Sequence, residues 1–543
     1  MQITKSLSSL ASVNGFSDLL KDYLSGNEAL TPFYGHPPTL EGFDRMLASA
    51  SFPRTNRGVL EQVTKAQYQK AGITPGTITQ ANLDKLKYPE AFTVCTGHQL
   101  CLFTGPLYFI YKIISTINLA EALGKKYPDH HFVPVFWMAS EDHDFEEVNH
   151  ARLFGKKLVW NKEEALGSID SMPCGKISTH SLDRVFAELK SLLGNFPYAG
   201  ELFEMLKNAY TKGEDLGDAT RLTVDKLFGQ YGLVTLDASD PLLKEQFVTI
   251  MKEELEQAPN EAIVRKSISD LEKAGYGAQV NPREINLFYM NNRFRGRIEK
   301  SKEGDGFVVI NSDIRFSHQE ILKELETNPA HFSPNVVLRP LYQQILLPNV
   351  AYVGGPGEIA YWLEYKAMFE KHKVPFPVLV PRNFVFWVDT NNAAKIEKLK
   401  LDIPTLSGNL PDLEKAYMQN QLDSSARLEE DLGKLTEVFG RIIQKALASD
   451  PTLKALAEAE FQKSSAGVKN LEAKMLKAAK QKHETALSQI RTIKEKLFPE
   501  GQLQERVDNF IPFYIKHGQR FLDALKQGLD PFEHDLIIFT EKE

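Results

Sequence analysis

Residues 132–150 read Phe-Val-Pro-Val-Phe-Trp-Met-Ala-Ser-Glu-Asp-His-Asp-Phe-Glu-Glu-Val-Asn-His. The first seven residues form a continuous apolar run, which is typical of a strand buried on both faces of a parallel sheet. Carboxylates and imidazoles follow at once, and open α/β sheets bind their ligands in a crevice outside the carboxyl ends of the strands. This stretch therefore predicts both a parallel sheet and a functional site at its edge.

A first strand and helix precede this run. Residues 91–95 are β-prone, a glycine-containing loop follows, and a helix is expected from Pro106 to about Gly124. Apolar residues recur on one face of that helix, at Leu107, Ile110, Ile114 and Ile117. Strand, helix and strand form a βαβ unit, for which a parallel pair with a right-handed crossover is expected. The predicted fold class is α/β with a doubly wound parallel sheet.

The chain of 543 residues is too long for one simple core. We expect a helical lead-in over residues 1–90 and a core over 91–388, with insertions near 151–215 and 285–330. Further strand candidates are 233–236, 285–290, 307–310 and 377–380. The segment 285–310 could equally form an antiparallel hairpin inside the second insertion.

Residues 389–505 are rich in Lys, Glu, Gln, Ala and Leu and predict a helical arm. From Val468 onward the apolar residues follow mostly three-four spacing, which indicates a coiled coil. Residues 413–448 could fold against this helix, or the seam could pair two subunits into a homodimer. A single amphipathic helix lying on the core is the third possibility. Residues 506–543 become apolar again and are expected to return to the core.

The formal net charge of -7 offers no general attraction to nucleic acid or to an anionic membrane. The cysteines Cys95, Cys101 and Cys174 are too few for a disulfide framework and fit a reducing compartment. We find neither a signal peptide nor an apolar run long enough to span a bilayer. These features predict a cytoplasmic protein whose small-molecule substrates are held by local groups.

The loop at residues 96–107 lies between the first strand and the helix. Free N–H groups at a helix start favour a phosphate or a carboxylate, but the spacing matches neither a Walker loop nor a dinucleotide fingerprint. An ordinary tight turn would explain the loop as well. Lys112, two turns into the helix, could equally be a surface charge. The candidate binding residues of this region are Gly97, His98, Gln99, Thr104, Gly105, Pro106 and Lys112.

The acidic block comprises Glu141, Asp142, His143 and Asp144. If it is extended, Asp142 and Asp144 share one face. These residues could supply a general base, a carboxylate that binds an ammonium group, or a magnesium ligand. Zinc binding through His143, Asp144 and His150 is disfavoured, because no CxxC or HExxH spacing supports it. Acidic capping of a helix start is the purely structural explanation.

A third cluster follows the second insertion. Residues 352–362 read Tyr-Val-Gly-Gly-Pro-Gly-Glu-Ile-Ala-Tyr-Trp, which indicates a loop of unusual backbone geometry and then a helix start. A tight turn would account for the glycines, but an arginine upstream and aromatic residues downstream are typical of a ligand pocket. The candidates here are Arg339, Tyr342, Gly354, Gly355, Gly357 and Glu358.

The segments TGHQLCLFTGPLYFIYK, PVFWMASEDHDFEEVNH and RPLYQQILLPNVAYVGGPGEIAYW, in this order, resemble the cysteine ligase family of bacillithiol biosynthesis. The resemblance extends through Val380-Pro-Arg382 and 497–506. It implies a Rossmann-like core with connecting-peptide insertions, related to class I aminoacyl-tRNA synthetases, and a coiled-coil arm associated with dimerisation. The implied reaction joins the cysteine carboxylate to the glucosamine amine of glucosaminyl malate, the last step of bacillithiol synthesis. Activation by ATP with magnesium is the simplest chemistry for such a condensation.

On this resemblance, the loop 97–106 would hold phosphates or the activated carboxyl, with His98 among the catalytic residues. Asp142, His143 and Asp144 would bind and deprotonate the amine. Arg339 and the glycine loop would take the malate carboxylates or a nucleotide. The chain departs from the synthetase pattern, because it has no His-Ile-Gly-His motif and its nearest Lys-Met-Ser-Lys-Ser counterpart is Lys300-Ser-Lys302. A second nucleotide crevice between core and arm could involve Arg382, Gln504 and Arg506.

Two other functions fit the same sequence. The first is a non-catalytic sugar- or nucleotide-binding subunit whose coiled coil recruits a partner enzyme. The second is a metal-dependent hydrolase that uses the acidic block. Convergence of the acidic block with His98 on one pocket would favour the ligase.

Overall fold

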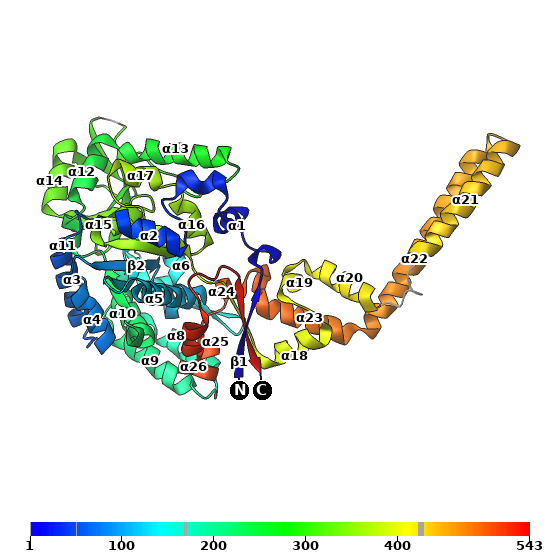
Figure 1. Ribbon diagram of the computed structural model, residues 1–543, viewed down its shortest axis with the longest axis horizontal. Coiled ribbons are helices and arrows are strands. Elements are labelled where there is room, and N and C mark those ends of the chain that lie inside the picture. The colour runs from blue at the N-terminus through cyan, green and yellow to red at the C-terminus, as the bar shows by residue number, and fades with distance from the viewer. Residues whose placement is uncertain are drawn as a thin grey trace.

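The structure is a computed structural model and describes residues 2–49, 51–167, 169, 171–302, 304–421 and 428–542. It consists of a large core and a long helical arm that projects from it (Figure 1). The N- and C-terminal strands meet between the two parts (Figure 1).

The central sheet, as far as the described residues show, has five strands in the order β13-β12-β2-β3-β6, all parallel. The strands are β2 (Ala91–His98), β3 (His131–Met138), β6 (Val234–Asp237), β12 (Asn349–Gly354) and β13 (Val378–Pro381). The earliest of these five strands in the sequence, β2, lies between β3 and β12, so the strand order reverses beside it. This is the topology of a Rossmann-type sheet, whose ligand crevice lies at that reversal.

The predicted βαβ unit is confirmed. Helix α5 (Tyr108–Lys126) connects β2 to β3, packs against both, and has most of its residues buried. The predicted strands at 233–236 and 377–380 correspond to β6 and β13 of this sheet. Strand β12 was not predicted from the sequence, because residues 352–362 were expected to form a loop followed by a helix start.

The segment between β3 and β6 is mostly helical. It contains the hairpin β4 (His150–Leu153) and β5 (Lys156–Val159), followed by helices α7 (Lys162–Leu166), α8 (Asp183–Leu193), α9 (Ala199–Lys212) and α10 (Leu216–Phe228). The loop at residues 171–176 turns back onto the end of β3, where Cys174 N donates to Asp142 O at 2.6 Å and Gly175 N to Ser140 O at 2.8 Å. This segment therefore fixes the backbone of the acidic block.

The segment between β6 and β12 contains a second sheet, which within the described residues has the order β10-β9-β8-β7-β11. Its strands are β7 (Leu287–Asn291), β8 (Phe294–Lys300), β9 (Gly306–Val309), β10 (Arg315–Ser317) and β11 (Phe332–Pro334). Strands β7 and β8 form an antiparallel hairpin, so this alternative for residues 285–310 is confirmed and a place in the central sheet is wrong. The accompanying helices are α11 (Pro241–Glu245), α12 (Val248–Gln257), α13 (Pro259–Lys273), α14 (His318–Thr327) and α15 (Arg339–Leu346).

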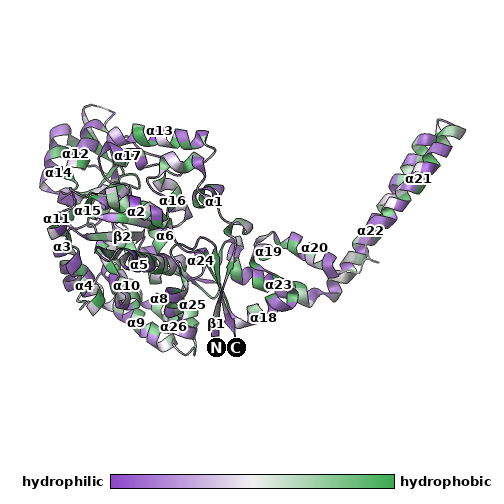
Figure 2. Cartoon of the chain, viewed as in Figure 1, coloured by the Kyte–Doolittle hydropathy of each residue, from purple (hydrophilic) through white to green (hydrophobic). Residues whose placement is uncertain are grey.

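The arm starts at β14 (Val385–Val388) and passes through α18 (Thr390–Leu399), α19 (Ile403–Ser407) and α20 (Leu410–Gln421). Helix α21 (Glu429–Ser449) then folds back along α22 (Leu453–Lys482), with Phe439 and Phe461 ring centroids 5.4 Å apart. Helix α23 (Glu484–Leu497) returns to the core. The predicted coiled coil is therefore found in part: α21 and α22 pair within one chain, whereas α23, which carries the later residues of the predicted seam, packs against α18, α20 and β14. Polar and apolar residues are mixed along the paired helices (Figure 2).

A third sheet joins the two ends of the chain. Strand β15 (Leu536–Lys542) lies between β14, to which it is parallel, and β1 (Gln2–Ser8), to which it is antiparallel. The predicted return of the C-terminal segment to the core is therefore found. Residues 2–8 are a strand where a helical lead-in was expected, because every one of them pairs with β15. Helices α1 (Asp18–Ser25), α2 (Leu40–Ser49), α3 (Arg57–Lys70) and α4 (Thr77–Lys85) follow.

Candidate functional site

A cavity of about 600 Å³ lies at the carboxyl ends of β2, β3 and β12, where the strand order reverses. The second sheet and helix α15 form its opposite wall. Among the described residues that line it, five are cationic, namely Lys112, Arg283, Arg295, Arg297 and Arg339, and three are carboxylates, namely Glu141, Asp142 and Glu358. The cavity therefore carries excess positive charge although the chain as a whole is acidic.

The acidic block forms a turn and not an extended strand. Strand β3 ends at Met138, and Asp142 N donates to Ala139 O. Consequently Asp142 and His143 line the cavity, whereas Asp144 is exposed and belongs to a shallow outer groove. The expectation that Asp142 and Asp144 share one face required an extended block, and this condition is not met because side-chain alternation ends with the strand. Asp142 and His143 line both the cavity and the outer groove, and Asp144 lines only the groove.

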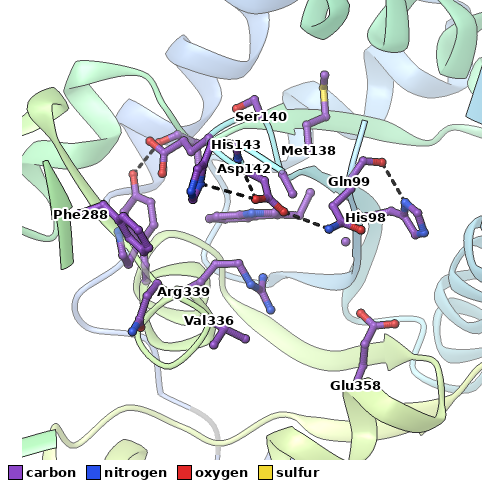
Figure 3. Close-up of a pocket in the computed structure, with 18 of the residues that line it drawn as sticks. His98, Gln99, Met138, Ser140, Asp142, His143, Phe288, Val336, Arg339 and Glu358 are labelled. Atoms are coloured by element: carbon purple, nitrogen blue, oxygen red, sulfur yellow. Dashed lines mark hydrogen bonds and ion pairs between the residues drawn. The ribbon is translucent and has the colours of Figure 1, made fainter. Parts of the chain in front are cut away.

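Asp142 is held in place by several donors. Its Oδ1 accepts the backbone N–H of His143 at 2.7 Å, and its Oδ2 accepts Gln99 Nε2 at 3.0 Å. Figure 3 shows Gln99 between Asp142 and His98. The loop after β2 and the block after β3 thus converge on one cavity.

His98 lies at the end of β2. Its Nδ1 is 2.8 Å from the carbonyl oxygen of Gln99, and its Nε2 is 3.2 Å from the hydroxyl of Tyr108. Burial, assisted by the charge of Lys112, lowers the pKa of His98 to about 4. His98 is therefore a neutral imidazole at physiological pH.

Lys112 is a buried cavity residue and not a surface charge. Its Nζ donates to Gly97 O at 2.5 Å and to Glu358 Oε2 at 2.6 Å. Glu358 also accepts Tyr352 OH at 2.6 Å and Gly355 N at 2.8 Å. Burial alone would raise the pKa of Glu358, but Lys112 and these donors lower it below its ordinary value. The pKa of Lys112 is lowered by burial, which its pairing with Glu358 opposes.

Arg339 is the first residue of helix α15, on the opposite wall (Figure 3), and Tyr342 lies in the first turn of the same helix. Arg339 Nη1 donates to Gln343 at 3.0 Å, whereas its buried Nη2 has no hydrogen-bond acceptor among the described residues. Tyr342 OH donates to Ala238 O at 2.7 Å. Arg339 therefore offers an unused donor to an anion.

The sequence prediction missed Arg295, which lines the cavity from the second insertion, and Lys244, which lies behind the acidic block. Arg295, on β8, stacks over the Phe288 ring at 3.9 Å and contacts His143. Lys244, on α11, is fully buried and forms a 2.6 Å ion pair with Glu141. The Asn-Arg-Phe-Arg-Gly-Arg run at 292–297 was the available signal, since it concentrates cations in one hairpin.

Some predicted residues lie outside the lining of this cavity: Thr104, Gly105, Pro106, Gly354, Gly355 and Gly357. The C-terminal segment covers the start of α5, because Asn509 Nδ2 donates to Phe103 O and Gly105 O, and Leu107 N donates to Asp508 O. Gly105 has φ +67, and a Cβ there would lie 2.6 Å from Cys101 Cβ, so this turn requires glycine. Phosphate binding by this half of the loop stays a prediction.

The predicted second crevice lies between core and arm. Gln504 lines a cavity of about 80 Å³ there, together with residues of α18 and α23, but Arg382 and Arg506 lie outside its lining. Arg382 is buried and forms two hydrogen bonds with Glu505, at 2.8 and 2.5 Å. A nucleotide site in this crevice stays a prediction.

Neither a metal-binding cluster nor a membrane-spanning helix is present among the residues that the structure describes. No group of three or more His, Cys, Asp or Glu side chains is placed to hold a metal ion within these ranges. No helix among the described residues is long and apolar enough to cross a membrane.

The sheet topology and the charged cavity at its reversal point define a Rossmann-like protein with a small-molecule site and a coiled-coil arm. Comparison with known families agrees. "Bacillithiol biosynthesis BshC, N-terminal Rossmann-like domain" matches residues 3–383, and "Bacillithiol biosynthesis BshC, C-terminal coiled-coil domain" matches residues 385–541. The chain belongs to the BshC family of bacillithiol biosynthesis.

Curated relatives share nearly the full length. The chain is 41% identical over 528 residues to a protein of Flavobacterium johnsoniae, which covers 97% of both chains. It is 40% identical to a protein of Christiangramia forsetii, again over 97% of both, and 38% identical to one of Cytophaga hutchinsonii, over 95% of both. Each of the three is named "Putative cysteine ligase BshC".

Proposed function

We propose that this protein is a ligase that joins the carboxylate of cysteine to the glucosamine amine of glucosaminyl malate, the last step of bacillithiol synthesis. The observation that carries the proposal is the pairing of two unlike subsites in one cavity. Asp142 is a fixed carboxylate on one wall, and the unused Nη2 of Arg339 lies on the other. The names of the relatives support the choice of cysteine.

The two subsites match the two ends of glucosaminyl malate. Its ammonium group would bind Asp142, and its malate carboxylates would bind Arg339 and the neighbouring cations, because arginine forms two parallel hydrogen bonds with a carboxylate. Such binding would hold the amine close to the activated carboxyl group, so the two groups would react without first having to meet by diffusion.

Condensation of a carboxylate with an amine in water requires activation. We propose that ATP with magnesium activates the cysteine carboxylate. We also propose that the activated carboxyl lies nearest to Gly97, Gln99 and the Lys112 region of the cavity. Asp142 would also accept the proton that the ammonium must lose before nitrogen can attack.

The test is a reconstituted assay with purified protein, cysteine, glucosaminyl malate and magnesium ATP, in which bacillithiol is detected by thiol labelling and mass spectrometry. Product that disappears when any one component is omitted would support the proposal. Arg339→Met should raise the KM for glucosaminyl malate more than it lowers kcat. Failure of folded protein to form product with ATP or with chemically activated cysteine would contradict the ligase function.

The non-catalytic alternative makes a different prediction. A binding subunit would bind glucosaminyl malate in calorimetry, and Arg339→Met would weaken that binding, but product would require a second protein.

A further inference from the structure

The tautomer of His143 is set by its neighbour Arg295. Arg295 Nη1 lies 3.0 Å from His143 Nδ1. A guanidinium group has donors and no acceptor, and it keeps its protons throughout the physiological range. His143 Nδ1 must therefore accept this hydrogen bond, and the neutral ring carries its proton on Nε2.

Arg295 is itself held by a chain of buried polar groups. Its Nε and Nη2 donate to Ser333 Oγ at 3.2 and 3.1 Å, and Nη2 also donates to Pro334 O at 3.3 Å. Ser333 Oγ donates to Glu141 Oε2 at 2.8 Å, and Glu141 Oε1 pairs with Lys244 at 2.6 Å.

The donor and the acceptor of each hydrogen bond in this series of side chains are fixed. Lysine and arginine only donate, and an ionised carboxylate only accepts, so Ser333 must accept from Arg295 and donate to Glu141. The chain thus prevents Arg295 from turning away from His143. This network connects the turn after β3, helix α11, the second sheet and the cavity.

The surroundings also keep His143 uncharged. Burial and Arg295 lower its pKa, and the carboxylates Asp142 and Asp144 oppose them only in part. A neutral ring whose Nδ1 is occupied can offer Nε2–H, but it has no free lone pair with which to remove a proton.

The second imidazole of the cavity has the opposite arrangement. His98 Nδ1 faces the carbonyl oxygen of Gln99, which is only an acceptor, so Nδ1 carries the proton. His98 Nε2 then holds the lone pair and accepts the hydroxyl of Tyr108.

We infer that the two cavity histidines have opposite tautomers, with His143 a hydrogen-bond donor through Nε2–H and His98 an acceptor through Nε2. Arg295, Ser333, Glu141 and Lys244 are positioning residues for His143. The tautomers stand on the structure alone. We assign an oxygen of the activated cysteine carboxyl as the acceptor of the His143 Nε2–H hydrogen bond, and this assignment rests on the proposed function. His143 then stabilises the negative charge that develops on that oxygen as the amine attacks, while Asp142 accepts the proton that the amine loses.

The test is nuclear magnetic resonance of full-length protein labelled with ¹⁵N-histidine, recorded at about pH 7.5. His143→Gln and His98→Gln assign the two rings by loss of their signals. The expected result is protonated Nε2 in His143 and protonated Nδ1 in His98. Protonated Nδ1 in His143, or a charged ring, would overturn the inference.

Arg295→Met and Ser333→Ala test the positioning chain. In folded Arg295→Met, the His143 signals should change to a mixture of tautomers, whereas those of His98 should stay unchanged. Ser333→Ala removes one hydroxyl and should give a smaller change of the same kind. An unaltered His143 tautomer in folded Arg295→Met would refute the role of Arg295.

Activity separates this inference from the proposed function. His143→Gln retains an amide N–H and should keep more kcat than His143→Ala, with KM for glucosaminyl malate nearly equal in both. Equal kcat values for the two variants would refute the donor role. Absence of product from wild-type protein with the expected tautomers would count against the ligase reaction and leave the tautomers intact.

Discussion

Lys112 Nζ lies 2.6 Å from Glu358 Oε2, so a buried ion pair connects helix α5, which follows β2, to helix α16 (Pro356–Trp362), which follows β12. The two strands lie on either side of the point where the sheet order reverses. Lys112 also binds the carbonyl of Gly97, the penultimate residue of β2. The first and third sequence clusters are therefore one structural unit, and the pair fixes the floor of the cavity.

Replacing Lys112 by Met should destabilise the protein strongly. Removal of the buried Lys112 leaves the partly buried Glu358 carboxylate without its cation, and loss of one partner of such a pair costs up to about 3–5 kcal/mol. The free energy of unfolding from urea denaturation measures this effect. Lys526→Met is the matched control, because its pair with Glu121 is partly exposed and should contribute less than about 1 kcal/mol. Similar losses in both variants would contradict the interpretation.

Asp142 and Asp144 should differ sharply in their effect on activity. Asp142→Asn removes the carboxylate that faces the amine, and we expect kcat/KM to fall by about 100-fold or more. Asp144→Asn alters an exposed side chain outside the main cavity and should change kcat/KM by less than about threefold. Steady-state kinetics of the two folded variants decide the matter, and a greater loss from Asp144→Asn would refute this site.

Glu364 should make stability depend on pH. It is buried and accepts the backbone N–H groups of Gln279 and Val280, in the segment that brings Arg283 to the cavity. Burial raises its pKa from 4.5 to about 7, although these donors oppose the shift. Between these two values the folded state binds more protons than the unfolded state, so this contribution to stability decreases as pH rises.

The effect of Glu364 should not exceed about 3 kcal/mol between pH 5 and 8. Glu364→Gln keeps an acceptor oxygen and removes the titration, so its stability should depend less steeply on pH. Urea denaturation at several pH values tests this, and identical pH profiles for wild type and variant would contradict the assignment.

The arm should pair two copies of the chain. Its outer helices expose large apolar side chains that the hairpin leaves uncovered, such as Leu456 at 60% and Leu471 at 54%. Burial of such groups is the main source of association free energy. Leu456→Lys with Leu471→Lys should shift the protein from dimer to monomer in light scattering after gel filtration. Lys463→Glu, an exposed change on the same helix, should leave the mass unchanged; a monomeric wild type would exclude this pairing.

Local patterns were sufficient for the strands and helix around the site. Strands β2 and β3 are apolar runs, and α5 repeats its apolar residues with helical spacing, so neighbouring residues determine each of them. Strand β12 was missed because it ends in glycine, a residue typical of turns. Asp144 was misplaced because the pattern did not show that the chain turns after Met138.

The far wall of the site depends on contacts between distant residues. Arg295, Ser333 and Lys244 are separated from the acidic block by about a hundred residues or more. Arg295 and Ser333 reach it from the second sheet, and Lys244 reaches it from helix α11. An arginine in a hairpin is usually a solvent-exposed charge, and its burial beside His143 is a tertiary property. Periodicity carries no information about such contacts.

The sheet that joins strands β1, β14 and β15 affects how the protein folds during its own translation. Strand β15 is its middle strand, and β1 forms its backbone hydrogen bonds with β15. Residues 2–8 leave the ribosome long before residues 536–542, which follow the core and the whole arm. Strand β1 must therefore remain without its partner β15 while more than five hundred residues are translated, and its polar Gln-Ile-Thr-Lys-Ser-Leu-Ser composition limits aggregation during that interval.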